Sequence, residues 1–252
     1  MCKSGQKSSS SPTTVLNVGG AICLWLVLTT SAFLSQLRRP ANNDDDATGN
    51  NSSGNITPLT VSLIFFNNLN IFISMCEICL GLNIDYIQRD YEKLRARYPH
   101  GKNEWRACVD YLTAPLTLRG LFDKVWLCKM WSTYALYDPS YQNRESFGFF
   151  IDFGNGMSTI PPSLLMNVAI VWPRMVSPLW VGCIGLAVYW QVLYGAIVYV
   201  FTFLFNRRYE GKSLAEVCLF VGVSNSLWMI FPPMGMYACV CMLRDKNMDV
   251  FQ

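Results

Sequence analysis

The sequence predicts an all-α membrane protein, a bundle of five transmembrane helices in one domain. The chain is 52% hydrophobic and only 15% charged, whereas soluble domains carry about 25% charged residues. Five long stretches lack Asp, Glu, Lys and Arg, and each reaches the roughly 20 residues that a helix needs to cross the hydrocarbon core. Because lipid cannot satisfy open backbone groups, the spans should be helical. The expected helix cores cover residues 18–34, 59–82, 149–172, 179–205 and 217–242.

The first span could be mistaken for a cleavable signal peptide, since Lys3 and Lys7 precede it. Its apolar run exceeds the 7 to about 15 residues of a signal-peptide core, and no clean small-x-small cleavage site follows. We therefore predict an uncleaved signal anchor. The expected organisation is a cytosolic N-terminal tail, a membrane domain with a polar loop and a long amphipathic connection, and a C-terminal tail. Their residues are 1–14, 15–243 (loop 38–57, connection 85–146) and 244–252.

The basic residues predict which ends of the helices face the cytosol. Most of the 20 Lys and Arg residues fall in the N-terminal tail, the connection and the segment 207–212. Cytosolic loops carry an excess of these residues, so the N-terminus should be cytosolic. The loop 38–57 would then be lumenal, where its sequons at Asn50, Asn51 and Asn55 could be glycosylated.

The connection 85–146 has two parts. The first, DYIQRDYEKLRARYPHGK, is highly charged and predicts a short exposed helix. The second, ACVDYLTAPLTLRGLFDKVWLCKMW, mixes apolar and basic residues in the pattern of a helix lying in the membrane interface. The alternative is that both are extensions of the second and third spans. Because the net charge is only +3 and basic residues alternate with acids, neither reading predicts a nucleic-acid partner.

The ten cysteines do not predict a metal site or a disulfide framework. Most lie in or beside apolar runs, where a thiol behaves as a small hydrophobe. Cys76 and Cys79 form one CxxC, but the chain has a single histidine, His100, and no second pair at ligand spacing. We expect no metal and no cofactor.

Two acids, Glu77 and Asp152, lie within the second and third predicted spans. A charge at the middle of a bilayer costs about 3 kcal/mol even on the lowest scale, so an acid there marks a functional site by default. The alternative is a structural acid that burial keeps protonated. These two residues are the leading candidates for a reactive site.

Several motifs in the C-terminal half resemble those of the emopamil-binding proteins, the sterol Δ8-Δ7 isomerases of the EXPERA superfamily. MWSTYALYDPSY resembles the sequence leading into that family's middle span, and NSLWMIFP resembles its Asn-x-Leu-Trp-x-x-x-Pro. The resemblance covers residues 131–243 well and the region of Glu77 loosely. The residues that carry it are Trp131, Tyr134, Ala135, Asp138, Tyr141, Asp152, Pro161, Tyr194, Gly195, Tyr199, Asn225, Leu227, Trp228 and Pro232.

The resemblance implies a five-helix fold around a sterol-sized cavity in the endoplasmic reticulum membrane. In that family a ring double bond migrates when one sterol carbon is protonated and another loses a proton. Glu77 and Asp152 would be the catalytic acids. Substrate would be bound by Trp228, whose indole would lie beside the carbocation, and by Asn225, Tyr194 and Tyr134. The implied partners are a sterol or other hydrophobic small molecule and the bilayer, and a homodimer is compatible with them.

The chain also departs from the family's pattern. Ile73 stands where the family has a catalytic histidine, and Thr133, Ala196 and Phe203 stand where it has acids. Asp152 is one methylene shorter than the family's glutamate, which draws its carboxyl back by about 1.5 Å. Single residues also have structural readings: Trp228 as an interface anchor and Asn225 as a helix-helix hydrogen bond.

Three functions therefore remain. The first is a sterol Δ8-Δ7 isomerase. The second is a non-catalytic EXPERA-type protein that binds sterols, lipids or amphiphilic amines. The third is an unrelated small transporter or channel accessory, in which the two acids form a proton or cation relay.

Overall fold

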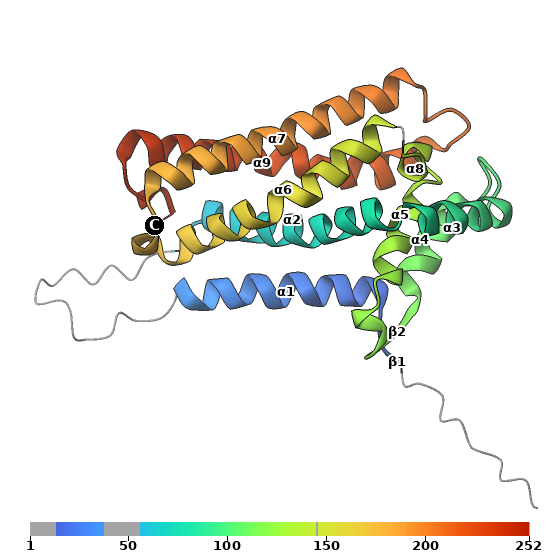
Figure 1. Cartoon of the computed structure of the whole chain (residues 1–252), viewed down its shortest axis with the longest axis horizontal. Helices are drawn as coiled ribbons and strands as arrows, with labels where there is room; N and C mark the ends of the chain where they lie inside the picture. Colours follow the sequence, from blue (N-terminus) through green and yellow to red (C-terminus); the bar gives the residue numbers. More distant parts are fainter. Residues whose placement is uncertain (1–13, 38–55, 145, 252) are drawn as a thin grey trace, which may run out of the picture.

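Long helices running side by side dominate the structure (Figure 1). The computed structural model describes residues 14–37, 56–144 and 146–251. The sequons and nearly all of the N-terminal tail and polar loop lie outside these ranges. In the described part of the chain, the long helices are α1 (Val18–Leu37), α2 (Pro58–Leu82), α6 (Phe147–Val171), α7 (Pro178–Phe205) and α9 (Ser224–Asp245). The bounds of α1, α2, α6 and α7 agree closely with the helix cores expected from the sequence, whereas α9 begins later than the expected core 217–242.

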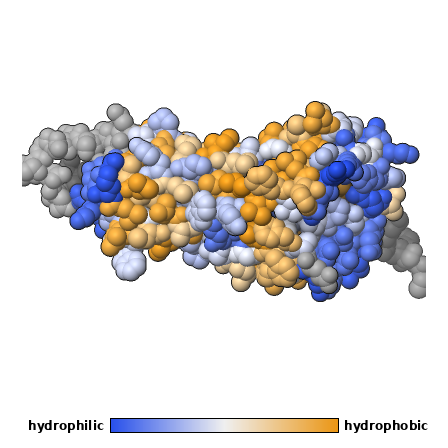
Figure 2. Space-filling view, turned by 90° about the horizontal axis from the view of Figure 1, so that it is seen from above, coloured by the Kyte–Doolittle hydropathy of each residue, from blue (hydrophilic) through white to orange (hydrophobic). Residues whose placement is uncertain are grey.

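Four helical segments are long and apolar enough to cross a membrane, among the residues that the structure describes. These segments are α1, α2, α7 and the continuous run Leu214–Asp245, which joins α8 (Leu214–Val217), the π-helical turn η4 (Cys218–Val223) and α9. On the face shown in Figure 2, apolar side chains cover most of the middle of the molecule and hydrophilic side chains gather at its two ends. These features confirm the prediction of an α-helical membrane protein. Helix α6 is 25 residues long but is not among the four segments, because acidic, amide and hydroxyl side chains lower its hydropathy.

The connection between α2 and α6 contains the short helix expected in its first part and differs from the prediction in its second part. It forms three separate helices, α3 (Ile84–Arg97), α4 (Glu104–Thr113) and α5 (Val125–Tyr134), which gather at one end of the bundle together with α8 (Figure 1). The expected interfacial helix is broken because Pro115 follows α4 and Gly120 begins the 3₁₀ turn η1 (Gly120–Phe122). Helix α3 follows α2 after the single cap residue Asn83, as an extension of the second span would, whereas α4 and α5 are separate from the spans and Ser146 caps α6.

A small antiparallel sheet is a second departure from the all-helical prediction. Strand β1 (Thr14–Asn17) pairs with β2 (Pro115–Thr117). The sheet joins the start of α1 to the connection, so Thr14, assigned from the sequence to the N-terminal tail, belongs to the folded domain. Short 3₁₀ turns complete the described elements: η2 (Pro139–Gln142), η3 (Pro173–Met175) and η5 (Asp249–Phe251).

Helix α2 forms the centre of the bundle. In its most apolar stretch of 18 residues, 67% is buried within the protein, compared with 11% for the corresponding stretch of α1 at the edge of the bundle. It packs most extensively against α6, while α7 packs against α9. Lipid and protein interiors are similarly apolar, so close packing and buried hydrogen bonds have to hold such helices together.

Buried amides supply such hydrogen bonds between α2, α6 and α7. Asn67 Nδ2 donates to Asn167 Oδ1 at 3.0 Å, Asn167 Nδ2 donates to Asn68 Oδ1 at 3.0 Å, and the Tyr189 hydroxyl donates to Asn67 Oδ1 at 2.9 Å. A polar group without a partner in hydrocarbon costs several kcal/mol. The network therefore favours one register of these three helices.

Buried ion pairs attach the loop after α7 to the short helices. Glu104 is paired with Arg95 and with Lys212, whose Nζ lies 3.4 Å from Glu104 Oε2. Arg208 is paired with Asp138 at 2.6 Å. Burial lowers the pKa of the Lys212 ammonium, and the nearby Glu104 carboxylate opposes that shift. These pairs hold one end of α7 against α4 and η2.

Candidate functional site

A cavity of about 170 Å³ lies among α2, α5, α6, α7 and α9, next to η2. It contains both acids singled out in the sequence, Glu77 from α2 and Asp152 from α6. Its volume is below the roughly 300 Å³ at which ligand sites usually begin. A ligand of sterol size would have to widen the cavity or leave part of itself outside. Its walls are mainly apolar and aromatic, with a few polar groups facing one another.

Glu77 is buried, with 5% of its surface exposed, and its Oε2 has no hydrogen-bond partner. The hydroxyl of Ser74, one turn earlier, pairs with that of Thr159 on α6 at 2.7 Å. Gly156 of α6 packs directly against this part of α2. A Cβ at Gly156 would lie 2.7 Å from Glu77 Cβ and 2.9 Å from Ile78 N. The glycine therefore allows α6 to approach closely enough to bring the two acids to one cavity.

Asp152 reaches the cavity from α6. Tyr141 lines the same cavity, and its hydroxyl interacts with the Asp152 carboxyl group. Asn155 lies one turn further along α6, and its Oδ1 accepts a hydrogen bond of 2.8 Å from Gln191 Nε2. The Glu77 and Asp152 carboxyl groups interact electrostatically. Two carboxyl groups therefore face one space from two helices.

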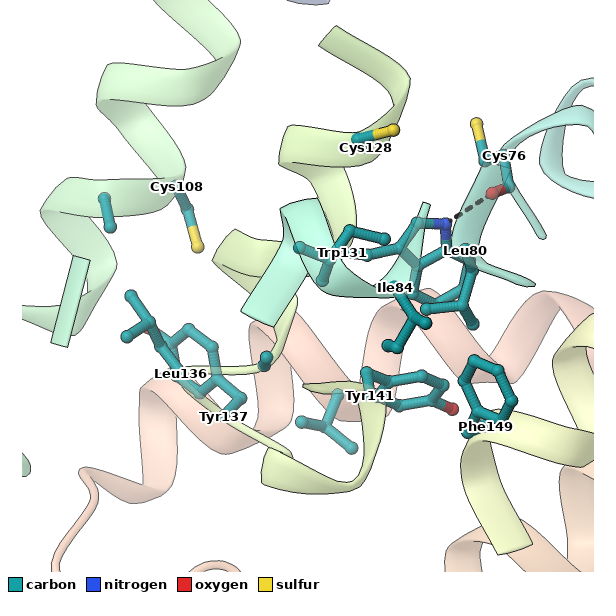
Figure 3. Close-up of a cluster of buried hydrophobic side chains, with 14 of the residues drawn as sticks. Cys76, Leu80, Ile84, Cys108, Cys128, Trp131, Leu136, Tyr137, Tyr141 and Phe149 are labelled. Carbon is teal, nitrogen blue, oxygen red and sulfur yellow. Dashed lines mark hydrogen bonds between the residues drawn. The ribbon is translucent and has the colours of Figure 1, made fainter. Parts of the chain in front are cut away.

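Two tryptophans form the aromatic wall of the cavity. Trp131 Nε1 donates to the Cys76 carbonyl at 2.7 Å, which fixes α5 against α2 (Figure 3). Trp228 Nε1 donates to Asn70 Oδ1 at 3.3 Å, and Asn70 Nδ2 donates to Ser163 Oγ at 3.1 Å. Both indoles are thus held in fixed orientations. An indole face attracts a cation within about 6 Å.

Asn70 holds the Trp228 indole, and a double-mutant cycle should show it. Replacing Asn70 with leucine removes the acceptor of the indole N–H, so Asn70→Leu and Trp228→Phe should be coupled by about 0.6 kcal/mol, the usual size of such a bond between membrane helices. Reversible unfolding in mixed detergent and SDS measures both single variants and the double variant. Additive effects on the free energy of unfolding would contradict this role of Asn70.

Tyr134 and Asn225 form a polar corner of the cavity. Asn225 Nδ2 donates to the Tyr134 hydroxyl at 3.1 Å, and the Tyr134 and Tyr199 hydroxyls lie 3.0 Å apart. Burial raises the pKa of Tyr134 to about 12, so its hydroxyl stays protonated at neutral pH. The π-helical turn η4 ends immediately before Ser224 and Asn225, which both line the cavity. Such turns change the direction of the following side chains and are frequent at functional sites.

Five of the six residues chosen from the sequence line this one cavity: Glu77, Asp152, Trp228, Asn225 and Tyr134. Tyr194 does not. Its side chain is 52% exposed on the outside of α7 and stacks on Trp190, with ring centroids 5.8 Å apart. Its neighbour Gly195 lines the cavity, and one residue turns a helix by about 100°, so Tyr194 points away from it.

The cavity also contains residues that were not chosen from the sequence. Tyr199 and Tyr141 belong to the motifs quoted above, and Asn155 lies three residues after Asp152, on the same face of a helix. That spacing could have identified Asn155. Ile73 and Ala196 also line the wall. The cavity is therefore apolar at two positions where the resemblance would place a histidine and an acid.

Among the described residues, no group of three or more His, Cys, Asp and Glu side chains could hold a metal ion. Comparison with protein-family models, with curated proteins and with solved structures finds no match for this chain. The site geometry therefore carries the functional argument.

Proposed function

We propose that this protein is a sterol Δ8-Δ7 isomerase of the endoplasmic reticulum membrane, with a five-span bundle of EXPERA type. The observation that carries the proposal is the convergence of Glu77 and Asp152, from different helices, on one cavity beside the Trp228 indole. The partners that follow from it are a sterol and the surrounding bilayer.

The reaction requires three groups, and this site offers all of them. One carboxylic acid protonates a carbon of the Δ8 double bond, and the other carboxylate removes a proton from the carbon on the opposite side of the cation. Positioned acids and bases each contribute about 10²- to 10⁴-fold to such steps. The indole face and the carboxylates stabilise the carbocation formed between the two proton transfers.

The fifth span of the proposed bundle is α6. Its 25 residues reach about 37 Å at a helical rise of 1.5 Å per residue, which exceeds the roughly 30 Å of the hydrocarbon core. Its polar side chains Ser163 and Asn167 bond to α2. Because those groups are satisfied within the bundle, low hydropathy does not prevent α6 from crossing. The excess of basic residues supports a cytosolic position for α3, α4 and α5.

A second function is favoured by one observation. Ile73 and Ala196 leave the cavity with fewer polar groups than the isomerase pattern implies. A non-catalytic protein that binds sterols, lipids or amphiphilic amines needs only an apolar cavity and an acid, and this cavity provides both.

Expression in a yeast strain that lacks its own sterol Δ8-Δ7 isomerase separates the two functions. We expect Δ7 sterols to appear in the sterol profile measured by mass spectrometry. Continued accumulation of Δ8 sterols, with the protein shown to be expressed and inserted in membranes, would contradict the isomerase and favour the binding protein.

A further inference from the structure

A second hollow lies at the end of the bundle where the short helices gather. Its volume is about 460 Å³, and it is lined by the loop that follows α7 together with His100 and Pro139. The loop contributes Arg207, Arg208, Glu210, Gly211 and Lys212. We call it the outer pocket. Most of its lining side chains are charged, in contrast to the mainly apolar cavity that holds Glu77 and Asp152.

One buried acid, Asp138, connects to both spaces. It is 0% exposed and directly precedes Pro139 of the outer pocket. Arg208 Nη1, which belongs to the wall of the outer pocket, donates to both Asp138 oxygens at 2.6 and 2.7 Å. The Ser140 backbone N–H donates to Asp138 Oδ1 at 2.9 Å. Lys212 adds a second positive charge nearby. The outer side of Asp138 is therefore in contact with groups that water can reach.

The inner side of Asp138 leads into the cavity. The Tyr199 hydroxyl lies near enough to the Asp138 carboxylate to interact with it, and the Tyr134 hydroxyl lies 3.0 Å from that of Tyr199. Both tyrosines line the cavity. Their rings pack around Tyr141, with centroids 5.2 Å away for Tyr134 and 6.0 Å for Tyr199. The packed rings hold the hydroxyls in place.

The remaining step crosses the cavity from the Tyr134 hydroxyl to Asp152. No direct bond joins these two groups, but the space between them is the cavity itself. A water molecule needs about 10–15 Å³ of such volume and two or more polar partners. A cavity of about 170 Å³ with these hydroxyls and carboxyls meets both conditions. Water bridges such groups nearly as well as a direct hydrogen bond.

We propose that Asp138, Tyr199 and Tyr134 form a proton relay between the outer pocket and the membrane cavity, and that this relay restores the proton on Asp152. The need for it rests on the proposed function. Each isomerisation leaves the proton donor ionised and the acceptor protonated, and surrounding lipid supplies no water to reverse this. Chains of acids and hydroxyls are the usual proton paths within membranes.

The relay conserves protons at every step. A proton from water in the outer pocket binds the Asp138 carboxylate. Tyr199 accepts a proton from Asp138 as it passes its own to Tyr134, which passes its proton through cavity water to the Asp152 carboxylate. At each oxygen one O–H bond forms as another breaks, and rotation of the hydroxyls restores the starting arrangement. The reverse sequence carries a proton outward.

Infrared spectroscopy of the purified full chain in lipid nanodiscs tests the relay without any sterol. After transfer to D₂O, the carboxyl band that Asp152→Asn removes should shift as its proton exchanges. The pH is set low enough for this band to be present. We expect Tyr199→Phe and Tyr134→Phe to slow the exchange at least tenfold, because each removes one hydroxyl and keeps the ring packing. The control is Tyr194→Phe, which removes a hydroxyl outside the cavity and should exchange at the wild-type rate.

Wild-type exchange rates in both relay variants would overturn the proposal, because the proton would then reach Asp152 by another route. This result is independent of whether sterols are isomerised. Slow exchange in the variants of a protein that converts no sterol would support the relay and contradict the isomerase. Lower sterol turnover in Tyr199→Phe with unchanged exchange would place that tyrosine on the substrate and overturn the relay.

Discussion

Replacing Asp152 with asparagine is expected to lower sterol turnover by about 10²- to 10⁴-fold, the usual contribution of one positioned acid or base. The amide keeps the size of the side chain and can still interact with the Tyr141 hydroxyl, but it can neither give nor take a proton. Glu77→Gln should have an effect of the same size. The ratio of Δ7 to Δ8 sterols in the isomerase-deficient yeast strain measures both.

Two further variants are controls for the loss of the Asp152 carboxyl group. Asp249→Asn makes the same chemical change at an exposed acid in η5, far along the chain from the cavity, and should leave the sterol ratio unchanged. Asp152→Glu restores the length of the acid that the resemblance implies and should keep turnover. Full turnover in both Asp152→Asn and Glu77→Gln would show that the two acids are structural.

Substituting Gly156 with alanine is expected to lower the free energy of unfolding by about 1–3 kcal/mol, the usual cost of overpacking. The added Cβ would lie 2.9 Å from Ile78 N and 3.0 Å from the Ser74 carbonyl oxygen. These are backbone atoms and cannot rotate away, so α2 and α6 would have to separate. Because the two acids are on these helices, turnover should fall as well.

Gly154→Ala is the matched control for this prediction. It adds the same methyl group two residues away on the same helix, where no atom beyond the helix's own nearby backbone and the two adjacent residues lies within 4 Å of the new Cβ. Reversible unfolding in mixed detergent and SDS should leave Gly154→Ala at least as stable as the wild type, since alanine favours helix over glycine. Equal effects of the two substitutions would show that the close approach at Gly156 does not hold the helices together.

The long helices could be predicted from the sequence because their signal is local. Runs without charge determine where a chain can cross lipid, and the bounds of α1, α2, α6 and α7 follow them closely. Hydropathy alone was less informative for α6, whose buried Ser163 and Asn167 are satisfied only by partners on α2. Those partners are nearly 100 residues away in the chain.

The small sheet and the π-helical turn could not be predicted, because they depend on more than the residue pattern of one segment. The pairing of β1 with β2 joins residues about 100 positions apart, and the π-helical turn before Asn225 has no residue pattern of its own. Both acids and Trp228 could be chosen in advance because a polar or aromatic residue inside an apolar span is conspicuous. Tyr194 lies outside the cavity, which the order of a motif could not reveal because it does not say which face of a helix each residue occupies.

The central claim is that Glu77 and Asp152 move a sterol double bond by proton transfer. The most direct measurement is to incubate the purified full chain in nanodiscs with a Δ8 sterol in D₂O and to analyse the product by mass spectrometry. We predict a Δ7 sterol that carries one deuterium on the newly protonated carbon, and no product with Asp152→Asn. Unchanged Δ8 sterol, recovered bound to a folded protein, would contradict the claim and identify the chain as a binding protein.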